Sequence, residues 1–503
     1  MVKARNSGLA AAGAMVYPAV MKPWGIMGRI LFAAAALTVA AALSMSRHEA
    51  LLAYGLNLSA GAMTGVIIGW SLLSFCFTGL IFGIRSGLKL PGWTAAAVVL
   101  LCSAAGALSA FSIYLLEVKY ERGESDLRRL GKYCRDLPAW EARSEELRKG
   151  ILGAARLDPP PARAPLNPVF HSRREHEGYS VENVILETVP GFFLAGNLYR
   201  PLPSVEGAKI PVVIIPHGHF PHGRFNPDTQ LLASAFARMG ALAFLYDMAG
   251  RGETTQVSHD DPNALTLQLW NSMRVLDFML ALPGADAERV AMTGASGGGT
   301  QTFLCAAVDK RVTLSAPVAM VSSWMYGGCA CESGLPIHRS GMSGFGTNNA
   351  EIAALAGPRP QLIVSIDADW TRTVPEREFP YIRGVYALYH REAFLKNKHF
   401  AGEAHDFGPS KRSAVCMFVA GHFMLDFTRV LKPVSGAEGG TGKPSSLGNR
   451  TVREFDDGAV EAEEVMRAFD AEHPLPAGAL RGWDAVMASL RGTAPETGER
   501  KEP

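Results

Sequence analysis

Apolar residues follow two different patterns along the chain. Three long apolar runs lie near its start, at about residues 24–45, 58–84 and 92–116, and only four charged side chains occur between residues 30 and 116. Each run reaches the roughly 20 residues that a helix needs to cross the hydrocarbon core of a bilayer. The pattern therefore predicts three transmembrane helices in residues 24–116, in contact with membrane lipid.

Charged residues around these runs predict an orientation. Four basic residues and no acidic residue precede Ile30, and Arg85 and Lys89 lie between the second and third runs. Because basic loops stay in the cytoplasm, we expect a multi-pass cell-membrane protein whose part after residue 116 is extracytoplasmic. A cleaved signal peptide for the first run, or a buried helical bundle for all three, are the alternatives.

Later in the chain the apolar runs are short and end in polar or glycine-rich turns. We expect strands at residues 212–215, 241–246, 289–293, 318–321 and 361–366, after an early hairpin at 179–200. Helical patterns at residues 229–239, 264–282, 298–308 and 379–394 lie between them. Buried strands that alternate with helices predict an α/β fold with a mostly parallel sheet, in which ligands bind at the carboxyl ends of the strands.

Composition divides the chain into four predicted parts. These are a membrane domain (1–117), a helical stalk with a proline-rich linker (118–165), a catalytic domain (166–430) and a flexible C-terminal extension (431–503). The chain has 503 residues, of which 48% are hydrophobic and 19% charged, so it is not a disordered protein. Its 49 basic and 47 acidic residues give a net charge of +2, which offers no electrostatic basis for binding nucleic acid.

The segment Gly294–Gly298 matches the G-x-S-x-G pattern of a nucleophile elbow. It has the context that this pattern requires, a short apolar strand before it and a helix after it. The glycines are needed because side chains at their positions would collide with the neighbouring backbone. Ser296 is therefore the candidate nucleophile.

A nucleophilic serine needs a histidine base and an acid that orients it, in the chain order Ser, Asp/Glu, His. His405 lies in a glycine-flanked polar loop before the last apolar helix and is our candidate base, ahead of His399 and His422. For the acid we favour Asp369, which follows the strand ending at residue 366. Asp367 and Glu332 remain alternatives.

His217-Gly218-His219 follows the strand at 212–215, where such folds place half of an oxyanion hole. We expect the backbone N–H groups of His219 and Gly297 to hold the oxyanion. A metal site at these histidines is not expected, because no carboxylate is adjacent. We expect Asp247 and Arg251 to pin loops around the site.

The seven cysteines do not settle whether the chain folds in an oxidising or a reducing compartment. Cys329 and Cys331 are too close in sequence for an ordinary loop disulfide and lack the second pair of ligands that zinc requires. We expect both to be structural, and a bridge to another cysteine is the next possibility. No cofactor and no metal is expected.

Several motifs together resemble the acetylxylan esterase-like branch of the α/β-hydrolase superfamily, near cephalosporin-C deacetylases and glucuronoyl esterases. The resemblance covers residues 140–425 and rests on Pro216–Gly218, Asp247–Gly252, Gly294–Gly298, Gly327–Glu332, Pro358–Pro360, Asp369–Thr371, Glu378–Pro380 and Ala404–Asp406. It implies ester hydrolysis through an acyl-serine with Ser296, His405 and Asp369 as the triad. The three membrane runs depart from the usual secreted or soluble pattern of this branch.

The resulting hypothesis is a membrane-anchored serine esterase that acts on short-chain acyl esters such as an acetylated carbohydrate. A lipid-proximal ester is the other substrate considered. Two alternatives of different class remain: a non-catalytic membrane assembly or sensor protein with a hydrolase-like domain, and a serine peptidase.

Overall fold

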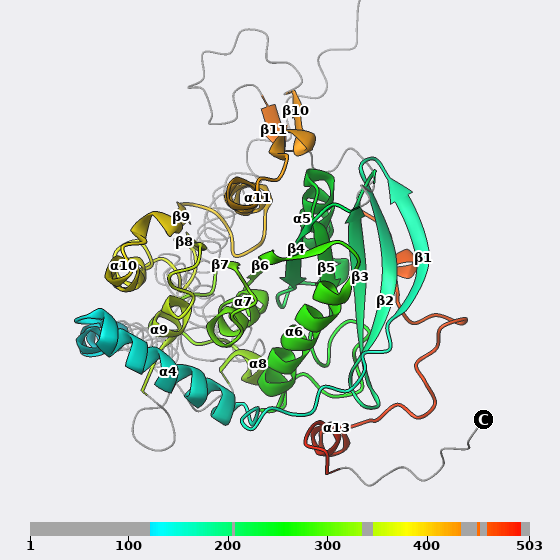
Figure 1. Cartoon of the computed structure of the whole chain (residues 1–503), viewed down its shortest axis with the longest axis horizontal. Helices are drawn as coiled ribbons and strands as arrows, with labels where there is room; N and C mark the ends of the chain where they lie inside the picture. The colour runs from blue at the N-terminus through cyan, green and yellow to red at the C-terminus, as the bar shows by residue number, and fades with distance from the viewer. Residues whose placement is uncertain (1–120, 204–206, 334–345, 434–449, 453–459, 494–503) are drawn as a thin grey trace, which may run out of the picture. The chain divides into compact units, whose positions relative to one another are not determined.

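The computed structural model describes residues 121–203, 207–333, 346–433, 450–452 and 460–493 (Figure 1). All of them belong to one compact unit, residues 119–503. The predicted transmembrane runs lie outside the described residues. The four-part division of the chain stays a prediction.

A nine-stranded sheet forms the centre of this unit, with the strand order β1-β2-β3-β5-β4-β6-β7-β8-β9. β1, β2, β3 and β5 pair antiparallel, and all pairs from β5 to β9 are parallel. The strands are β1 (Val169–His176), β2 (Tyr179–Val189), β3 (Phe192–Pro201), β4 (Ile210–Pro216), β5 (Leu242–Tyr246), β6 (Ala285–Ala295), β7 (Leu314–Val318), β8 (Gln361–Ile366) and β9 (Leu395–Phe400). A separate antiparallel pair joins β10 (Leu431–Pro433) and β11 (Arg450–Val452).

Helices cover both faces of the sheet (Figure 1). α5 and α11 pack on one face, and α6 and α7 on the other, with α4 and α9 outside α7. The helices are α4 (Leu137–Ala154), α5 (Pro227–Met239), α6 (Ala264–Ala281), α7 (Gly297–Val308), α8 (Ala330–Ser333), α9 (Asn349–Ala354), α10 (Glu378–Leu388), α11 (Pro409–Phe423), α12 (Glu463–Met466) and α13 (Trp483–Leu490). Single 3₁₀ turns occur at η1 (Gly131–Cys134), η2 (Gly223–Phe225), η4 (Glu392–Phe394) and η5 (Phe427–Val430).

Burial explains why the central strands are nearly continuous apolar runs. Every residue of β5, β7 and β8 is buried, since helices cover these strands on both sides. Such strands lose the alternation of apolar and polar side chains that marks a half-exposed strand. The predicted mostly parallel sheet is confirmed. The strand expected at 318–321 instead lies at Leu314–Val318.

The helices that the structure describes contradict the prediction of three transmembrane helices. Among the described residues, no helix is both long enough and apolar enough to cross a membrane. The two longest described helices, α4 and α6, have 18 residues each. Glu145 and Lys149 of α4 are exposed, and α6 packs on the sheet. Residues 24–116 lie outside the described part. The multi-pass membrane location and the lipid contacts are therefore dropped.

Helix α4, which falls in the predicted stalk, docks on the folded unit. Its Arg143 donates two hydrogen bonds to Glu351, Nε to Oε1 at 3.0 Å and Nη2 to Oε2 at 2.9 Å. The two side chains are 2% and 0% exposed. Removing one partner of such a buried pair costs about 3–5 kcal/mol, because the other charge stays buried. This pair therefore fixes the helix against α9.

Residues 460–493, which belong to the predicted flexible extension, are held by the first strands and the turn after β5. Glu461 forms ion pairs with Arg174 and His176, each at 2.7 Å. Burial raises the pKa of Glu461, but the hydrogen bonds and charges of these two partners outweigh it and leave the pKa lowered. Further along, the Leu480 N–H donates to the Gly191 carbonyl at 2.8 Å. This segment therefore packs as part of the fold.

Candidate active site

Ser296 lies in a strained turn between β6 and α7. Its φ is +55° and its ψ −122°, a conformation that non-glycine residues rarely adopt. The Ser296 N–H donates to the Val318 carbonyl at 3.0 Å, and its own carbonyl accepts the Thr300 N–H at 3.0 Å. The serine thus follows the carboxyl end of a central strand and begins a helix, as the elbow pattern requires.

The neighbouring glycines are required by the close approach of β4. A Cβ atom on Gly294 would lie 2.4 Å from the Pro216 carbonyl oxygen, and one on Gly298 would lie 2.2 Å from the same atom. Backbone atoms cannot yield as a flexible side chain can. The expected collision at these two positions therefore occurs, and it explains why both are glycine.

His405 and Asp369 form the shortest histidine–carboxylate contact in the described structure at this end of the sheet. His405 Nδ1 lies 2.6 Å from Asp369 Oδ2. Asp369 follows β8 and is 2% exposed. Its other oxygen accepts the backbone N–H and the hydroxyl of Thr371, both at 2.6 Å. The His405 ring packs beside Trp370, with 4.6 Å between the ring centroids. Asp369 is thereby fixed, and it orients the imidazole.

The two alternative acids have other partners. Asp367 Oδ1 accepts the Gly402 N–H at 2.7 Å at an exposed position, so it holds the loop rather than the histidine. Glu332 is 5% exposed, and its Oε2 accepts the Gly328 N–H at 2.8 Å. Burial raises the pKa of Glu332 to about 7. Of the three candidate acids, the structure brings Asp369 onto His405.

The three histidines after β4, His217, His219 and His222, have different surroundings. His217 is buried; its Nδ1 faces the Gly218 carbonyl at 2.7 Å, and its Nε2 accepts the Met248 N–H at 3.1 Å. Burial lowers the pKa of His217 to about 4. The His222 side chain is 67% exposed. His217 is thus enclosed by backbone, whereas His222 lines the same surface pocket as His219.

His219 lies against the elbow. A Cβ atom on Gly297 would come within 2.7 Å of His219 Cε1 and 2.5 Å of Met248 Cε. The structure therefore brings together the two residues expected to supply the oxyanion hole, and glycine at 297 leaves space for the imidazole. The role of their N–H groups stays a prediction. Burial lowers the pKa of His219 to about 3, so its ring is neutral.

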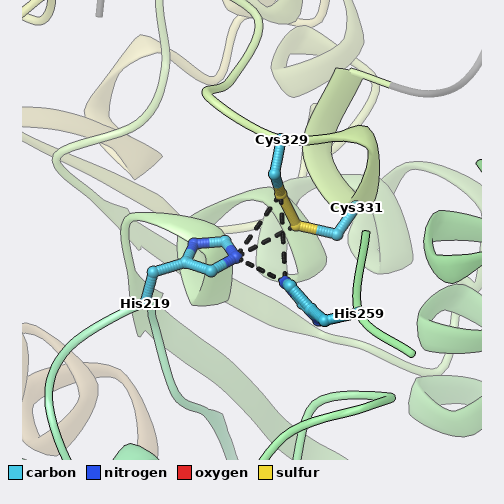
Figure 2. Close-up of side chains that lie close together, drawn as sticks. All are labelled: His219, His259, Cys329 and Cys331. Atoms are coloured by element: carbon cyan, nitrogen blue, oxygen red, sulfur yellow. Dashed lines mark hydrogen bonds between the residues drawn. A yellow bond between two sulfur atoms is a disulfide. The ribbon is translucent and has the colours of Figure 1, made fainter. Parts of the chain in front are cut away.

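Sequence reasoning missed a cluster beside His219. His219 and His259 meet with Cys329 and Cys331, and the two cysteines form a disulfide with 5.3 Å between their Cα atoms (Figure 2). The expectation that this pair is too close in sequence for an ordinary disulfide is wrong, because the turn into α8 brings the two cysteines close enough to bond. The residues come from three separate segments, so no local spacing could reveal them.

The turn after β5 is held by a buried arginine. Arg224 Nη1 donates to both oxygens of Asp247, at 2.8 and 2.9 Å, and the same carboxylate accepts the Glu253 N–H at 2.7 Å. Asp247 therefore pins this turn as expected. Arg251 instead lines a pocket of about 380 Å³ with His219 and seven other residues. Its Nε atom is buried and contacts no acceptor among the described residues.

Comparisons with known proteins identify the family. Residues 191–423 match the family model described as X-Pro dipeptidyl-peptidase (S15 family). The solved structure of the methylesterase BT1017 is 37% identical, with a TM-score of 0.63 over 73% of this chain and 78% of that chain. The chain belongs to the α/β-hydrolase superfamily and to the esterase family of that enzyme. It is a carboxylic ester hydrolase, as the motifs predicted.

Other solved esterases match this chain at lower similarity. An acetyl xylan esterase from Paenibacillus sp. R4 is 19% identical, with a TM-score of 0.39 over 55% of this chain and 93% of that chain. A glucuronoyl esterase from Teredinibacter turnerae T7901 is 16% identical, with a TM-score of 0.43 over 57% and 86%. No curated protein is a significant match to the sequence.

Proposed function

We propose that this hydrolase is a serine esterase that cleaves methyl esters through an acyl-serine intermediate. The observation that carries the proposal is the 2.6 Å contact between His405 Nδ1 and Asp369 Oδ2, on the loops that follow β9 and β8 at the same end of the sheet as the Ser296 elbow. The methyl leaving group is inferred from the methylesterase, which is 37% identical to this chain over the aligned part. The acetyl ester favoured by the motif resemblance is the competing substrate.

In the first half of the reaction, the Ser296 hydroxyl attacks the ester carbonyl while His405 takes its proton. Asp369 stabilises the imidazolium that forms. The N–H groups of Gly297 and His219 stabilise the oxyanion, and one such donor contributes about 2.7–4 kcal/mol. His405 then gives its proton to the departing alkoxide, which leaves as methanol.

The second half repeats these steps with water. His405 takes a proton from water, the hydroxide attacks the acyl-serine, and the proton returns to Ser296 as the acid leaves. The pocket beside His219 lies next to this chemistry, because Phe220 in its wall has its ring centroid 6.0 Å from that of His405. We infer that the pocket holds the acid part of the ester and that the Arg251 guanidinium binds an oxygen of it.

A second candidate function is a serine peptidase. The match of residues 191–423 to the family of X-Pro dipeptidyl-peptidases favours it. The same serine and histidine would then cleave an amide. Both reactions pass through an acyl-serine, so they are separated by substrate and not by the residues involved.

The test compares four substrate classes with the full chain and its Ser296→Ala variant. These are methyl esters of sugar acids, followed by methanol release; p-nitrophenyl acetate; p-nitrophenyl octanoate; and Xaa-Pro p-nitroanilides. We expect kcat/KM to be highest for the methyl esters and to vanish in the variant. A preference for p-nitrophenyl acetate would mean that the natural substrate is an acetyl ester and not a methyl ester. A preference for the anilides would establish the peptidase. Equal rates for wild type and variant would contradict the serine mechanism.

A further inference from the structure

Four side chains with metal-binding atoms converge on one point (Figure 2), and one of them, His219, lies against Gly297 of the elbow. His219 follows β4, His259 lies between β5 and α6, and Cys329 and Cys331 lie at the start of α8. Nε2 of His219 is 2.8 Å from Nε2 of His259, 3.0 Å from Sγ of Cys331 and 3.4 Å from Sγ of Cys329. All four ligand atoms lie within 4.8 Å of one another.

The outer nitrogens of both histidines face acceptors. His259 Nδ1 lies 2.7 Å from the Ala249 carbonyl, which can only accept, so this nitrogen carries the proton and Nε2 presents its lone pair to the cluster. His219 Nδ1 lies 3.5 Å from Oε1 of the buried Glu332. A carboxylate or carbonyl behind each ring is the usual arrangement around histidines that bind a metal, because it fixes the tautomer and the ring plane.

The contact between the two rings is compatible with a cation bound between their Nε2 atoms. If both Nδ1 atoms carry protons, two Nε2 lone pairs meet at 2.8 Å and no hydrogen bond joins them. A cation between the two nitrogens turns this repulsion into coordination. The alternative without metal places the proton of His219 on Nε2, which then donates to Nε2 of His259 at 2.8 Å. The two arrangements differ in whether the cluster binds a metal.

We propose that the reduced protein binds one Zn²⁺ ion through Nε2 of His219 and His259 and Sγ of Cys329 and Cys331. Two thiolates and two imidazoles are a common tetrahedral donor set for zinc. Bonds of about 2.3 Å to sulfur and about 2.0–2.1 Å to nitrogen place such ligand atoms roughly 3.3–3.8 Å apart. The cluster needs only small side-chain movements to reach these separations.

The disulfide is the metal-free form of this site. A dithiol reductant breaks the Cys329–Cys331 bond, gives two electrons and two protons to the sulfurs, and becomes a disulfide itself. Zinc binding then displaces one proton from each cysteine thiol. The oxidised pair has no thiolate to offer, so the affinity for zinc depends on the redox state of these two cysteines.

Four protein ligands leave no open position on the metal, so the site is structural and not catalytic. It joins three segments of the chain at His219, which contacts Gly297. The metal would thus fix the loop whose N–H is expected in the oxyanion hole. The zinc site stands whether or not the ester is a methyl ester.

The test loads the full chain with zinc after anaerobic treatment with dithiothreitol, followed by desalting and metal analysis. We expect about one zinc per chain in the reduced wild type and at least tenfold less after reoxidation. Cys331→Ser and His259→Gln should lose the metal. The matched controls, Cys134→Ser and His222→Gln, change the same residue types outside the cluster and should keep it.

Co²⁺ provides a second readout that does not depend on the folding of any variant. Bound to the reduced wild type, it should give a thiolate-to-cobalt charge-transfer band in the ultraviolet and the intense visible bands of a tetrahedral site. Reduced protein that retains no zinc, zinc that binds equally to the oxidised chain, or a cobalt spectrum without thiolate bands would each overturn the proposal.

Discussion

Two of the histidine–carboxylate pairs at the carboxyl ends of the strands have different surroundings. In one, His405 Nδ1 lies 2.6 Å from Asp369, whose other oxygen is held by Thr371. In the other, His219 Nδ1 lies 3.5 Å from Glu332, and its Nε2 faces His259 and two cysteines. The first pair has the contacts of a catalytic base and its orienting acid. The second has the contacts of a metal ligand and the group behind it.

Replacing each histidine should give the largest difference between the pairs. For His405→Ala we expect kcat to fall by a factor on the order of 10⁴–10⁶, because the base is lost. For His219→Ala we expect a loss of at most about 10²-fold, since the backbone N–H expected in the oxyanion hole remains. Steady-state kinetics on one ester substrate measures both. A greater loss in the His219 variant would reverse the assignment.

Substitutions at two neighbouring aspartates, Asp369 and Asp367, show which of them is the catalytic acid. Asp369→Asn should lower kcat by about 10⁴-fold, because an amide no longer stabilises the imidazolium and favours the wrong tautomer. Asp367→Asn is the matched control two residues away, and its rate should stay within about twofold of the wild type. Equal losses would mean that the whole loop, and not one carboxylate, is sensitive.

Thr371 tests how firmly the first pair must be held. Thr371→Val removes the hydroxyl that donates to Asp369 at 2.6 Å, a bond to a charged group valued at about 1.5–3 kcal/mol. We expect kcat to fall about tenfold to a hundredfold with little change in KM. Thr371→Ser keeps the hydroxyl and should restore most of the rate. If both variants behave alike, the loss comes from packing.

Glu332→Gln should have the smallest effect on catalysis. The glutamine oxygen can still accept the Gly328 N–H, and burial already disfavours the charge of Glu332. We expect kcat to stay within about fivefold of the wild type and stability to change by about 1 kcal/mol, measured by denaturant unfolding. A loss of 10³-fold or more would identify Glu332 as the catalytic acid in place of Asp369.

The sequence predicted most of the central sheet and missed its edge. The central strands are buried on both faces, so they are apolar enough to recognise. β9, with the sequence Leu-Lys-Asn-Lys-His-Phe, pairs on one side only and exposes both of its lysines, so it lacks the apolar run that made the central strands recognisable. The position of residues 460–493 was also missed, because it depends on contacts with β1 to β3 that are distant in sequence.

The sequence likewise indicated one part of the candidate site and missed another. Ser296 and Asp369 were chosen because each follows a recognisable strand, and His405 because its polar loop precedes the last apolar helix and completes the order Ser, Asp, His. The structure brings Asp369 and His405 together, and the catalytic roles of the three residues stay a prediction. The four residues of the cluster at His219 follow no characteristic order along the chain, and His259 lies in a turn that matches no motif. The three apolar runs in residues 24–116 predicted membrane helices on length and composition, and the described helices contradict that prediction.

The most direct test of the central claim is covalent labelling with a fluorophosphonate, which reacts with a serine only when a base activates it. The account predicts one adduct per chain, located on Ser296 by peptide mass spectrometry. It predicts no adduct in Ser296→Ala and strongly slowed labelling in His405→Ala, while Asp367→Asn labels at the wild-type rate. A folded wild type that does not react, or that reacts at another serine, would contradict the assignment of Ser296 as the nucleophile.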